Sequence, residues 1–392
     1  PDRPIVEYEL LIDQDTLIQQ LILKQSDPKK KKRIWMQHLK VRFGYDNDDL
    51  LFPVYLKSEE VKILEASGLR KPNYILPNGA GVGYGYFKMD SRSRSYLLEN
   101  LPNINDSYLR GVIWLNLWDE MIYGNIKPID MINLCIRALK TENDILNTQR
   151  ILSRLNSTFW NFLSENQRST KANQLESILR LHLNEATTIT NRSMYFRSLR
   201  SITITDNGYD WLKSIWMKND SIKGLTLSER DYITIASELA LRGKKDSQQI
   251  LDSQLNQISN PDRKSRFKFI MASLSNDLDI RDDFFELIKK EENREVEPWV
   301  QSAVAYLHHP LRSKDSEKYI LPSLELLEEI QRTGDIFFPA RFINATLSGH
   351  QSVNAKNIVN QFLKDHPNYT PALKLKILQA ADNLFRASII KD

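Results

Sequence analysis

The stretch Asn78–Phe87 reads NGAGVGYGYF and holds four of the 13 glycines in this chain of 392 residues. The four, at every second position, are Gly79, Gly81, Gly83 and Gly85. A dinucleotide-binding loop needs G-x-G-x-x-G and a P-loop needs Gly-Lys-Ser/Thr, and the stretch contains neither pattern. A period of two is that of a β-strand, whose side chains alternate between faces. We therefore predict a turn that enters a strand with one bare face, against which another backbone or a ring packs closely.

The residues up to Asp90 are typical of a small β domain. Their apolar side chains come in short runs between polar turns, at Leu17–Leu23, Ile34–Tyr45, Leu50–Leu56 and Val82–Met89. Such runs indicate half-buried strands. We predict a small antiparallel β-sandwich over residues 1–90.

A basic run, Lys29–Arg33, lies between two of these predicted strands. A solvated hairpin loop is the simpler interpretation of such a run. An anion-binding patch is the alternative.

From about residue 91 onward the sequence signals are those of helices. Pro128, Pro298, Pro322 and Pro371 each precede or open an amphipathic segment. Ser228 and Asp231 resemble a capping box, and Gly243 is placed to end the same helix. Segments of this length joined by short polar loops predict stacked helical hairpins, but no fixed repeat period is visible. The predicted fold class is therefore mainly α: a small antiparallel β-sandwich followed by a large, irregular α-helical solenoid over residues 91–392.

Composition excludes few classes of protein but gives no sign of special partners. The 54 basic and 50 acidic residues are mixed along the chain, so we expect neither a nucleic-acid nor a membrane partner. No apolar run approaches the roughly 20 residues of a membrane helix. Cys135 is the only cysteine, which rules out an internal disulfide and a thiolate zinc site.

Catalytic motifs are absent from the sequence. The six histidines include no H-E-x-x-H pair, and no Gly-x-Ser-x-Gly elbow occurs. His308 and His309 are predicted to cap the carbonyls at a helix end rather than to bind a metal. Cys135 is expected to be a buried small side chain. The pairs Glu291–Glu292 and Glu328–Glu329 are expected on solvated helix faces. We expect no catalytic residue, no metal ligand and no cofactor site in this chain.

One segment, Arg332–Phe342, is unusually apolar for a loop. It leaves a helix through Gly334 and carries Phe337 and Phe338 directly before a proline. A loop this apolar is expected to be buried, either against its own solenoid or against a neighbouring domain. Contact between helices is the simpler interpretation, and a role facing a ligand is the alternative.

Several motifs in order along the chain resemble zinc aminopeptidases of the aminopeptidase N (gluzincin) family. Ile75–Asn78, Gly83–Phe87 and Asp90 resemble the end of that family's β-sandwich, which leads directly into a helical C-terminal domain. Upstream, the segments around Gln25 and Trp35 resemble earlier strands of the sandwich, although Met36-Gln37 departs from the usual proline form. Downstream resemblances, to the family's helical domain or its bacterial branch, lie at Arg110–Tyr123, Glu297–Arg312, Arg332–Arg341 and Lys376–Asp382.

The resemblance implies a non-catalytic portion of such an enzyme. In the family, the zinc ligands and the G-x-M-E-N element belong to an upstream domain, and no position here matches them. The chain would then enclose the substrate chamber and contact the upstream catalytic domain of the same polypeptide. Zinc would belong to the parent enzyme, peptides would be the parent's substrates, and this chain alone would be inactive.

Within this interpretation, Phe337, Phe338 and Arg341 are the candidate chamber or interdomain surface. A guanidinium there could pair with a peptide carboxylate or an acidic side chain. Two alternatives stay open: a solenoid that binds a partner protein, and a homologous scaffold that has lost its zinc. The chain begins Pro1-Asp2-Arg3, without methionine, and we expect more protein upstream. A targeting segment would lie there, so the compartment is open between cytoplasm and periplasm.

Overall fold

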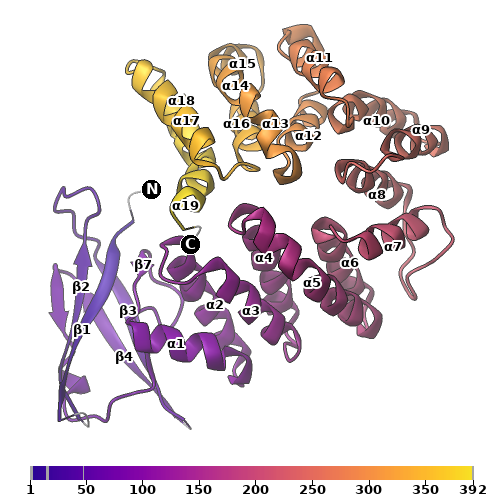
Figure 1. Ribbon diagram of the computed structural model, residues 1–392. Coiled ribbons are helices and arrows are strands. Elements are labelled where there is room, and N and C mark those ends of the chain that lie inside the picture. The colour runs from indigo at the N-terminus through magenta and orange to yellow at the C-terminus, as the bar shows by residue number, and fades with distance from the viewer. Residues whose placement is uncertain (1–2, 15–16, 47, 391–392) are drawn as a thin grey trace. The chain divides into compact units, whose positions relative to one another are not determined.

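The computed structural model describes residues 3–14, 17–46 and 48–390. Pro1 and Asp2 lie outside this range. The chain divides into two compact units, an N-terminal unit (Pro1–Leu155) and a C-terminal unit (Asn156–Asp392). Strands occupy the first part of the chain and helices the rest (Figure 1), so the predicted fold class is confirmed. Helices α1 to α3 belong to the same unit as the strands, and a domain boundary at residue 90 stays a prediction.

Two small sheets make up the β part of the N-terminal unit. The strands in the described range are β1 (Ile5–Asp13), β2 (Leu17–Ser26), β3 (Gln37–Gly44), β4 (Asp49–Leu56), β5 (Glu60–Lys62), β6 (Tyr74–Leu76) and β7 (Tyr86–Phe87). The orders are β5-β2-β1-β7 and β4-β3-β6. All pairs are antiparallel except β1 with β7, which is parallel. Buried side chains of both sheets, among them Val6, Leu23, Val41 and Phe43, share one core. This is the predicted sandwich.

The glycine-rich stretch is mostly turn, so the predicted alternation of faces is wrong. Its strand is only the two residues of β7, and Gly81 has a φ of +69° in the left-handed region. The predicted close approach is confirmed. A Cβ on Gly79 would lie 2.4 Å from the Cβ of Arg42, and the Gly79 N–H donates to the Lys40 carbonyl at 2.7 Å. The glycines therefore let a turn lie directly on β3, a contact that a larger residue would obstruct.

The basic run Lys29–Arg33 is an exposed loop, but it joins two sheets and not two strands of a hairpin. One carboxylate organises it. Asp27 accepts the N–H groups of Lys29 at 2.9 Å and Lys31 at 3.1 Å, and the Nε–H of Arg33 at 2.9 Å. The bond from Arg33 holds the pKa of Asp27 below its ordinary value. A solvated loop is thus confirmed and the hairpin is wrong.

The first helices follow the sheets directly. They are α1 (Ser91–Asn100), α2 (Ser107–Ile122), α3 (Pro128–Leu139) and α4 (Ile145–Asn161), which crosses the boundary between the units. A buried carboxylate links β7 to α1 and α2. Glu120 of α2 accepts the Met89 N–H at 2.8 Å and the Tyr86 hydroxyl at 3.3 Å, and pairs with Arg94 of α1 at 3.1 Å. Since Glu120 is fully buried, all three donors are needed to compensate for its lost hydration.

The described residues of the C-terminal unit form helices joined by loops, and no strand occurs among them. Its helices are α5 (Glu165–Glu185), α6 (Ile189–Ile202), α7 (Asp206–Trp216), α8 (Glu229–Leu241), α9 (Ser247–Gln257), α10 (Pro261–Leu274), α11 (Leu278–Ile288), α12 (Glu297–Leu307), α13 (Ser313–Ser316), α14 (Ile320–Glu325), α15 (Leu327–Thr333), α16 (Phe338–Leu347), α17 (Val353–Asp365), α18 (Pro371–Ala380) and α19 (Asp382–Ile390). Contacts run along one row, α6-α8-α10-α12-α16-α18. The other helices pack against this row or each other, as in a solenoid.

Polar contacts between successive hairpins show an approximate repeat that is not visible in the sequence. Tyr209 bonds Asp246, 37 positions away, and Trp216 bonds Gln254, 38 positions away. Further along, Arg281 and Asp315 are 34 apart, and His308 and His350 are 42 apart. Each hairpin thus meets the next at a separation of about 34–42 residues, which varies too much to show as a sequence period.

Helix ends follow local signals closely. The capping box of Ser228 and Asp231 is present, and Gly243 follows the C-cap of α8 with a φ of +70°. Pro128 and Pro298 lie in the first turns of α3 and α12, as predicted. One prediction is wrong, because Pro322 lies inside α14 and does not open it. Pro371 opens α18, as predicted, and the chain continues after Ala381 as α19.

Candidate functional site

The predicted site residues lie at the junction of α15 and α16, in the C-terminal unit. Phe338 is 2% exposed and Phe337 is 61% exposed, so the two neighbours have opposite environments. Arg341 is exposed, and its guanidinium carbon is 5.5 Å from the centre of the Phe337 ring. Ile336 beside them is 73% exposed. The expected burial within the solenoid therefore holds for Phe338 and is wrong for Phe337.

Two carboxylates hold this junction in shape. Asp335 accepts the N–H groups of Phe337 at 2.6 Å and Phe338 at 2.8 Å, so it caps the start of α16. Its own N–H donates to Glu297 of α12 at 2.7 Å. The amide bonds lower the pKa of Asp335, whereas burial raises the pKa of Glu297. The result is an outward-facing phenyl ring and guanidinium on a braced turn, a surface suited to contact with another molecule.

A second exposed surface lies on the N-terminal unit. It consists of Met36, Tyr55, Val82, Tyr84 and Tyr108, which we call the aromatic patch. Met36 and Val82 are the most exposed, at 70% and 71%. Single exposed apolar residues are ordinary, but a contiguous group indicates a surface that binds another protein or ligand.

Contacts tie the aromatic patch together. The Tyr55 hydroxyl donates to Met36 Sδ at 3.7 Å. The Gln37 side chain donates to the Tyr84 carbonyl at 3.1 Å and accepts its N–H at 2.9 Å. The Tyr108 hydroxyl donates to a carbonyl of the glycine-rich turn at 2.6 Å. These bonds hold the Tyr55 and Tyr108 side chains and the Tyr84 backbone in place, which lowers the entropy lost when a partner binds.

A hollow of about 320 Å³ adjoins the aromatic patch. It lies between the glycine-rich turn, α2 and the start of α4, and it includes Val82 and Tyr108. Leu115 and Leu146, both exposed, also line it. The apolar surface therefore continues from the glycine-rich turn onto the first helices.

The prediction for His308 is wrong. Its side chain does not cap a helix but meets His350, with Nδ1 of His308 2.8 Å from Nε2 of His350, and both rings are buried. Burial lowers the pKa of His308 well below its ordinary value and that of His350 to about 4. Both are therefore neutral at pH 7. His309 instead accepts the Leu311 N–H at 3.3 Å and so caps the next turn.

The remaining sequence candidates behave mostly as structural residues. Cys135 is buried, which raises the pKa of its thiol to about 12, so it is no nucleophile at neutral pH. Glu291, Glu292 and Glu328 are exposed, as expected. Glu329 is only half-buried and pairs with Arg294 at 2.5 Å.

Buried arginines at helix ends are the feature that the sequence did not predict. Arg242 donates to the carbonyls of Arg200 at 2.9 Å and Thr203 at 2.8 Å, at the end of α6. Arg312 donates to Ser273 and Leu274 at the end of α10, both at 2.6 Å. These carbonyls have no partner inside their own helix. An arginine's sequence position gives no sign of which helix end lies opposite, so no local signal could have found this role.

Within residues 3–14, 17–46 and 48–390, no group of three or more His, Cys, Asp or Glu side chains could hold a metal ion. In the same described ranges, no helix has the length and apolar character needed to cross a membrane. In comparisons with known proteins, no family model matches the chain, and the search of curated proteins finds no match.

Proposed function

We propose that this chain is the non-catalytic C-terminal portion of a zinc-dependent aminopeptidase, which encloses the substrate chamber and contacts an upstream catalytic domain. The order of the sequence motifs supports this proposal, as does a β part followed by a helical solenoid. In this proposal zinc and the catalytic residues belong to the upstream domain, and the parent's substrates are peptides.

The aromatic patch is the observation that carries the proposal. Two of the resembling motifs adjoin it, since Tyr84 belongs to Gly83–Phe87 and Tyr108 lies just before Arg110–Tyr123. Exposed aromatic side chains held by hydrogen bonds are typical of an interface with another domain. The patch is accordingly where the catalytic domain is proposed to bind.

The first test measures the activity of this chain without the upstream half. The purified chain, with zinc and a leucine chromogenic amide, is expected to give no turnover. The polypeptide encoded upstream is expected to contain H-E-x-x-H and to bind this chain. Zinc-dependent turnover by the chain alone, surviving repurification, would contradict the proposal, and an upstream sequence without H-E-x-x-H would favour the zinc-less scaffold.

The second part of the test asks whether the aromatic patch forms the interface with the upstream half. Replacing both Tyr55 and Tyr84 with Ser is expected to weaken binding of the upstream half at least tenfold, because buried aromatic anchors carry about 2 kcal/mol or more each. Leu375→Ser, at an exposed apolar position of the C-terminal unit, is the matched control. Equal affinities for the two variants would remove the patch from the interface.

Arg341 has a separate prediction. In the complete enzyme, Arg341→Ala is expected to lower kcat/KM for peptide substrates about tenfold, since a charge-assisted hydrogen bond contributes about 1.5–3 kcal/mol. Arg332→Ala, an exposed arginine six residues from the junction's Phe338, is the control. Unchanged kcat/KM for short and long peptides alike would show that Arg341 has no such role.

A further inference from the structure

A cavity of about 470 Å³ in the C-terminal unit is lined by features that favour an anion. Three segments form most of its wall: the start of α5, the turn Pro310–Asp315, and Gln351–Ser352 before α17; Ile204 and Glu317 complete it. We call it the α5–α17 cavity. A second hollow of about 410 Å³ shares Arg312 and Asp315 with it, so the two adjoin at these residues.

Arg168, from α5, is a buried cation in this wall without a carboxylate partner. Its Nη1–H donates to the Leu163 carbonyl at 2.8 Å, and its guanidinium carbon is 5.6 Å from the centre of the Trp160 ring. Among the described residues these are its contacts, and both partners are neutral. Burial lowers the pKa of Arg168, and the charge of Glu165 opposes this shift only in part, because no carboxylate bonds to the guanidinium.

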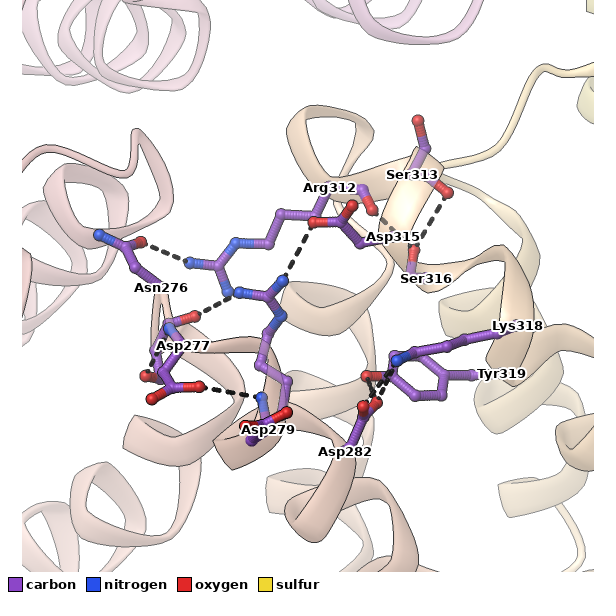
Figure 2. A network of polar contacts seen from close by, with 12 residues as sticks. Asn276, Asp277, Asp279, Asp282, Arg312, Ser313, Asp315, Ser316, Lys318 and Tyr319 are labelled. Carbon is purple, nitrogen blue, oxygen red and sulfur yellow. Dashed lines mark hydrogen bonds and ion pairs between the residues drawn. The ribbon is translucent and has the colours of Figure 1, made fainter.

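Arg312 is the second such cation. It donates to two backbone carbonyls, those of Ser273 and Leu274, at 2.6 Å. Figure 2 shows its weaker contact with Asn276, at 3.5 Å. Burial and the neighbouring charge of Arg281 lower the pKa of Arg312 to about 9. The nearby carboxylate of Asp315 is bonded to Arg281 instead, at 3.1 Å. Arg312 is therefore held by neutral groups, although a carboxylate is close.

Three guanidinium groups lie close enough to His309 to act on its charge. The pKa of His309 is held well below its ordinary value by burial and by three charges, those of Arg242, Arg312 and Arg168. Of these three, Arg242 pairs with Glu238, while the other two have no ion pair among the described residues. Positive charge thus accumulates beside the α5–α17 cavity.

The acidic residues of the wall are already engaged. Glu165 pairs with Lys314 at 3.2 Å on the surface, where such a pair contributes little. Glu317 accepts bonds from the side chains of Ser352 and Asn354. None of these acids bonds to Arg168 or Arg312, so the charge of the two arginines is left for a ligand.

Two helix N-termini and one unpaired acceptor complete the cavity. Ser164 and Ser352 are the N-caps of α5 and α17, so the positive ends of both helix dipoles face this region. The Gln351 Nε2–H donates to the Trp160 carbonyl at 2.8 Å, which leaves its buried Oε1 without a donor. A ligand that satisfies Oε1 needs a hydrogen of its own.

We propose that the α5–α17 cavity binds a small oxyanion that carries an O–H group, with hydrogen phosphate as the simplest example. Its oxygens accept from the guanidinium groups of Arg168 and Arg312, and its hydroxyl donates to Gln351 Oε1. The anion supplies the charge that the two buried arginines lack, and it occupies a site where helix dipoles favour negative charge. This proposal rests on the C-terminal unit alone and does not depend on the peptidase assignment.

Isothermal titration of the full chain with inorganic phosphate is the direct test. Binding with a Kd of about 1 mM or tighter is expected, with a rise in Tm as phosphate is added, because a ligand that binds only the folded state stabilises it. Acetate and glycolate are the comparison anions. Phosphate is expected to bind tightest and acetate weakest, since acetate has no hydroxyl for Gln351. Glycolate binding more tightly than phosphate would overturn phosphate as the ligand.

Variants separate the site from general charge effects. Arg168→Gln is expected to weaken phosphate binding at least tenfold, whereas Arg294→Gln is expected to leave it unchanged. Arg294 is the matched control because it is also buried at a helix end, yet it is paired with Glu329 and is not part of the cavity wall.

A surface variant keeps the test decisive if Arg168→Gln fails to fold. Ser169 is exposed on the cavity wall, so Ser169→Glu should fold and place a carboxylate beside Arg168. It is expected to abolish phosphate binding, while the uncharged Ser169→Gln retains it. Equal affinities for these two variants, or no binding of phosphate to the unaltered chain below about 10 mM, would overturn the proposal.

Discussion

Glu120→Ala is expected to lower the free energy of unfolding of the N-terminal unit by about 3 kcal/mol, because it leaves a buried amide and a guanidinium without their acceptor. The Glu120 carboxylate is fully buried and holds three donors, the Met89 N–H, the Tyr86 hydroxyl and Arg94. Its removal also opens a cavity between β7 and α2. Urea denaturation measures the loss, and hydrogen exchange at β1 and α2 locates it.

Two further variants test the reason for this loss. Burial raises the pKa of Glu120 in spite of its bonds, so the charge itself is disfavoured. Glu120→Gln is therefore expected to cost less than Glu120→Ala, since an amide oxygen still accepts from Met89 and Tyr86. Glu99→Ala, on the exposed face of α1, serves as the control. A loss below about 1 kcal/mol for Glu120→Ala would contradict a structural role for this network.

The His308–His350 pair is expected to make the C-terminal unit sensitive to acid. The pKa of His350 is about 4 in the folded chain, against an ordinary value of 6.5. A histidine with a lowered folded pKa gives its full stabilisation above pH 6.5 and loses it as the pH falls toward 4. His350 alone accounts for a decrease of about 2–3 kcal/mol in unfolding free energy between pH 7 and pH 4.5. His308, whose pKa is also lowered, adds to the decrease.

The surrounding charges do not reverse the direction of this pH dependence. Glu317 raises the pKa of His350 but is outweighed by burial. Tyr319, whose ring is 6.0 Å from that of His308, bonds Asp282. Unfolding in urea at several pH values measures the slope of the unfolding free energy against pH. Replacing both His308 and His350 with Leu is expected to flatten it between pH 7 and 4.5, whereas His366→Gln, at an exposed histidine, is not. An unchanged slope in the double variant would assign the acid sensitivity to other groups.

Local sequence signals predicted the architecture because they act over a few residues. Pro128, the Ser228–Asp231 box and Gly243 each fix a helix end through the backbone of their own turn. The alternating runs likewise predicted the strands of the sandwich. Periodicity failed at Asn78–Phe87, since Gly79 and Gly83 are required by close contacts that include β3, and Gly81 by its positive φ, and not by a strand's alternation.

The environments of the candidate site residues depend on contacts that cannot be read from the sequence. Phe337 and Phe338 are alike in sequence, yet at the start of α16, where Asp335 accepts both of their N–H groups, one is exposed and the other buried. His308 meets His350 from 42 positions away, and Arg312 reaches Ser273 from 39. These separations vary from one hairpin to the next, so no spacing rule could have joined the partners.

The arginine caps also bear on how the chain folds during synthesis. Arg242 completes the end of α6 from 39 to 42 positions downstream, and Arg312 completes the end of α10 from 38 to 39. When α6 or α10 leaves the ribosome, the side chain that satisfies its last carbonyls has not yet emerged. Each of these helices is therefore unfinished until the following hairpin emerges, and folding lags translation by one repeat. A ribosome that stalls between the two leaves a nascent chain whose newest helix end is open to chaperones and proteases.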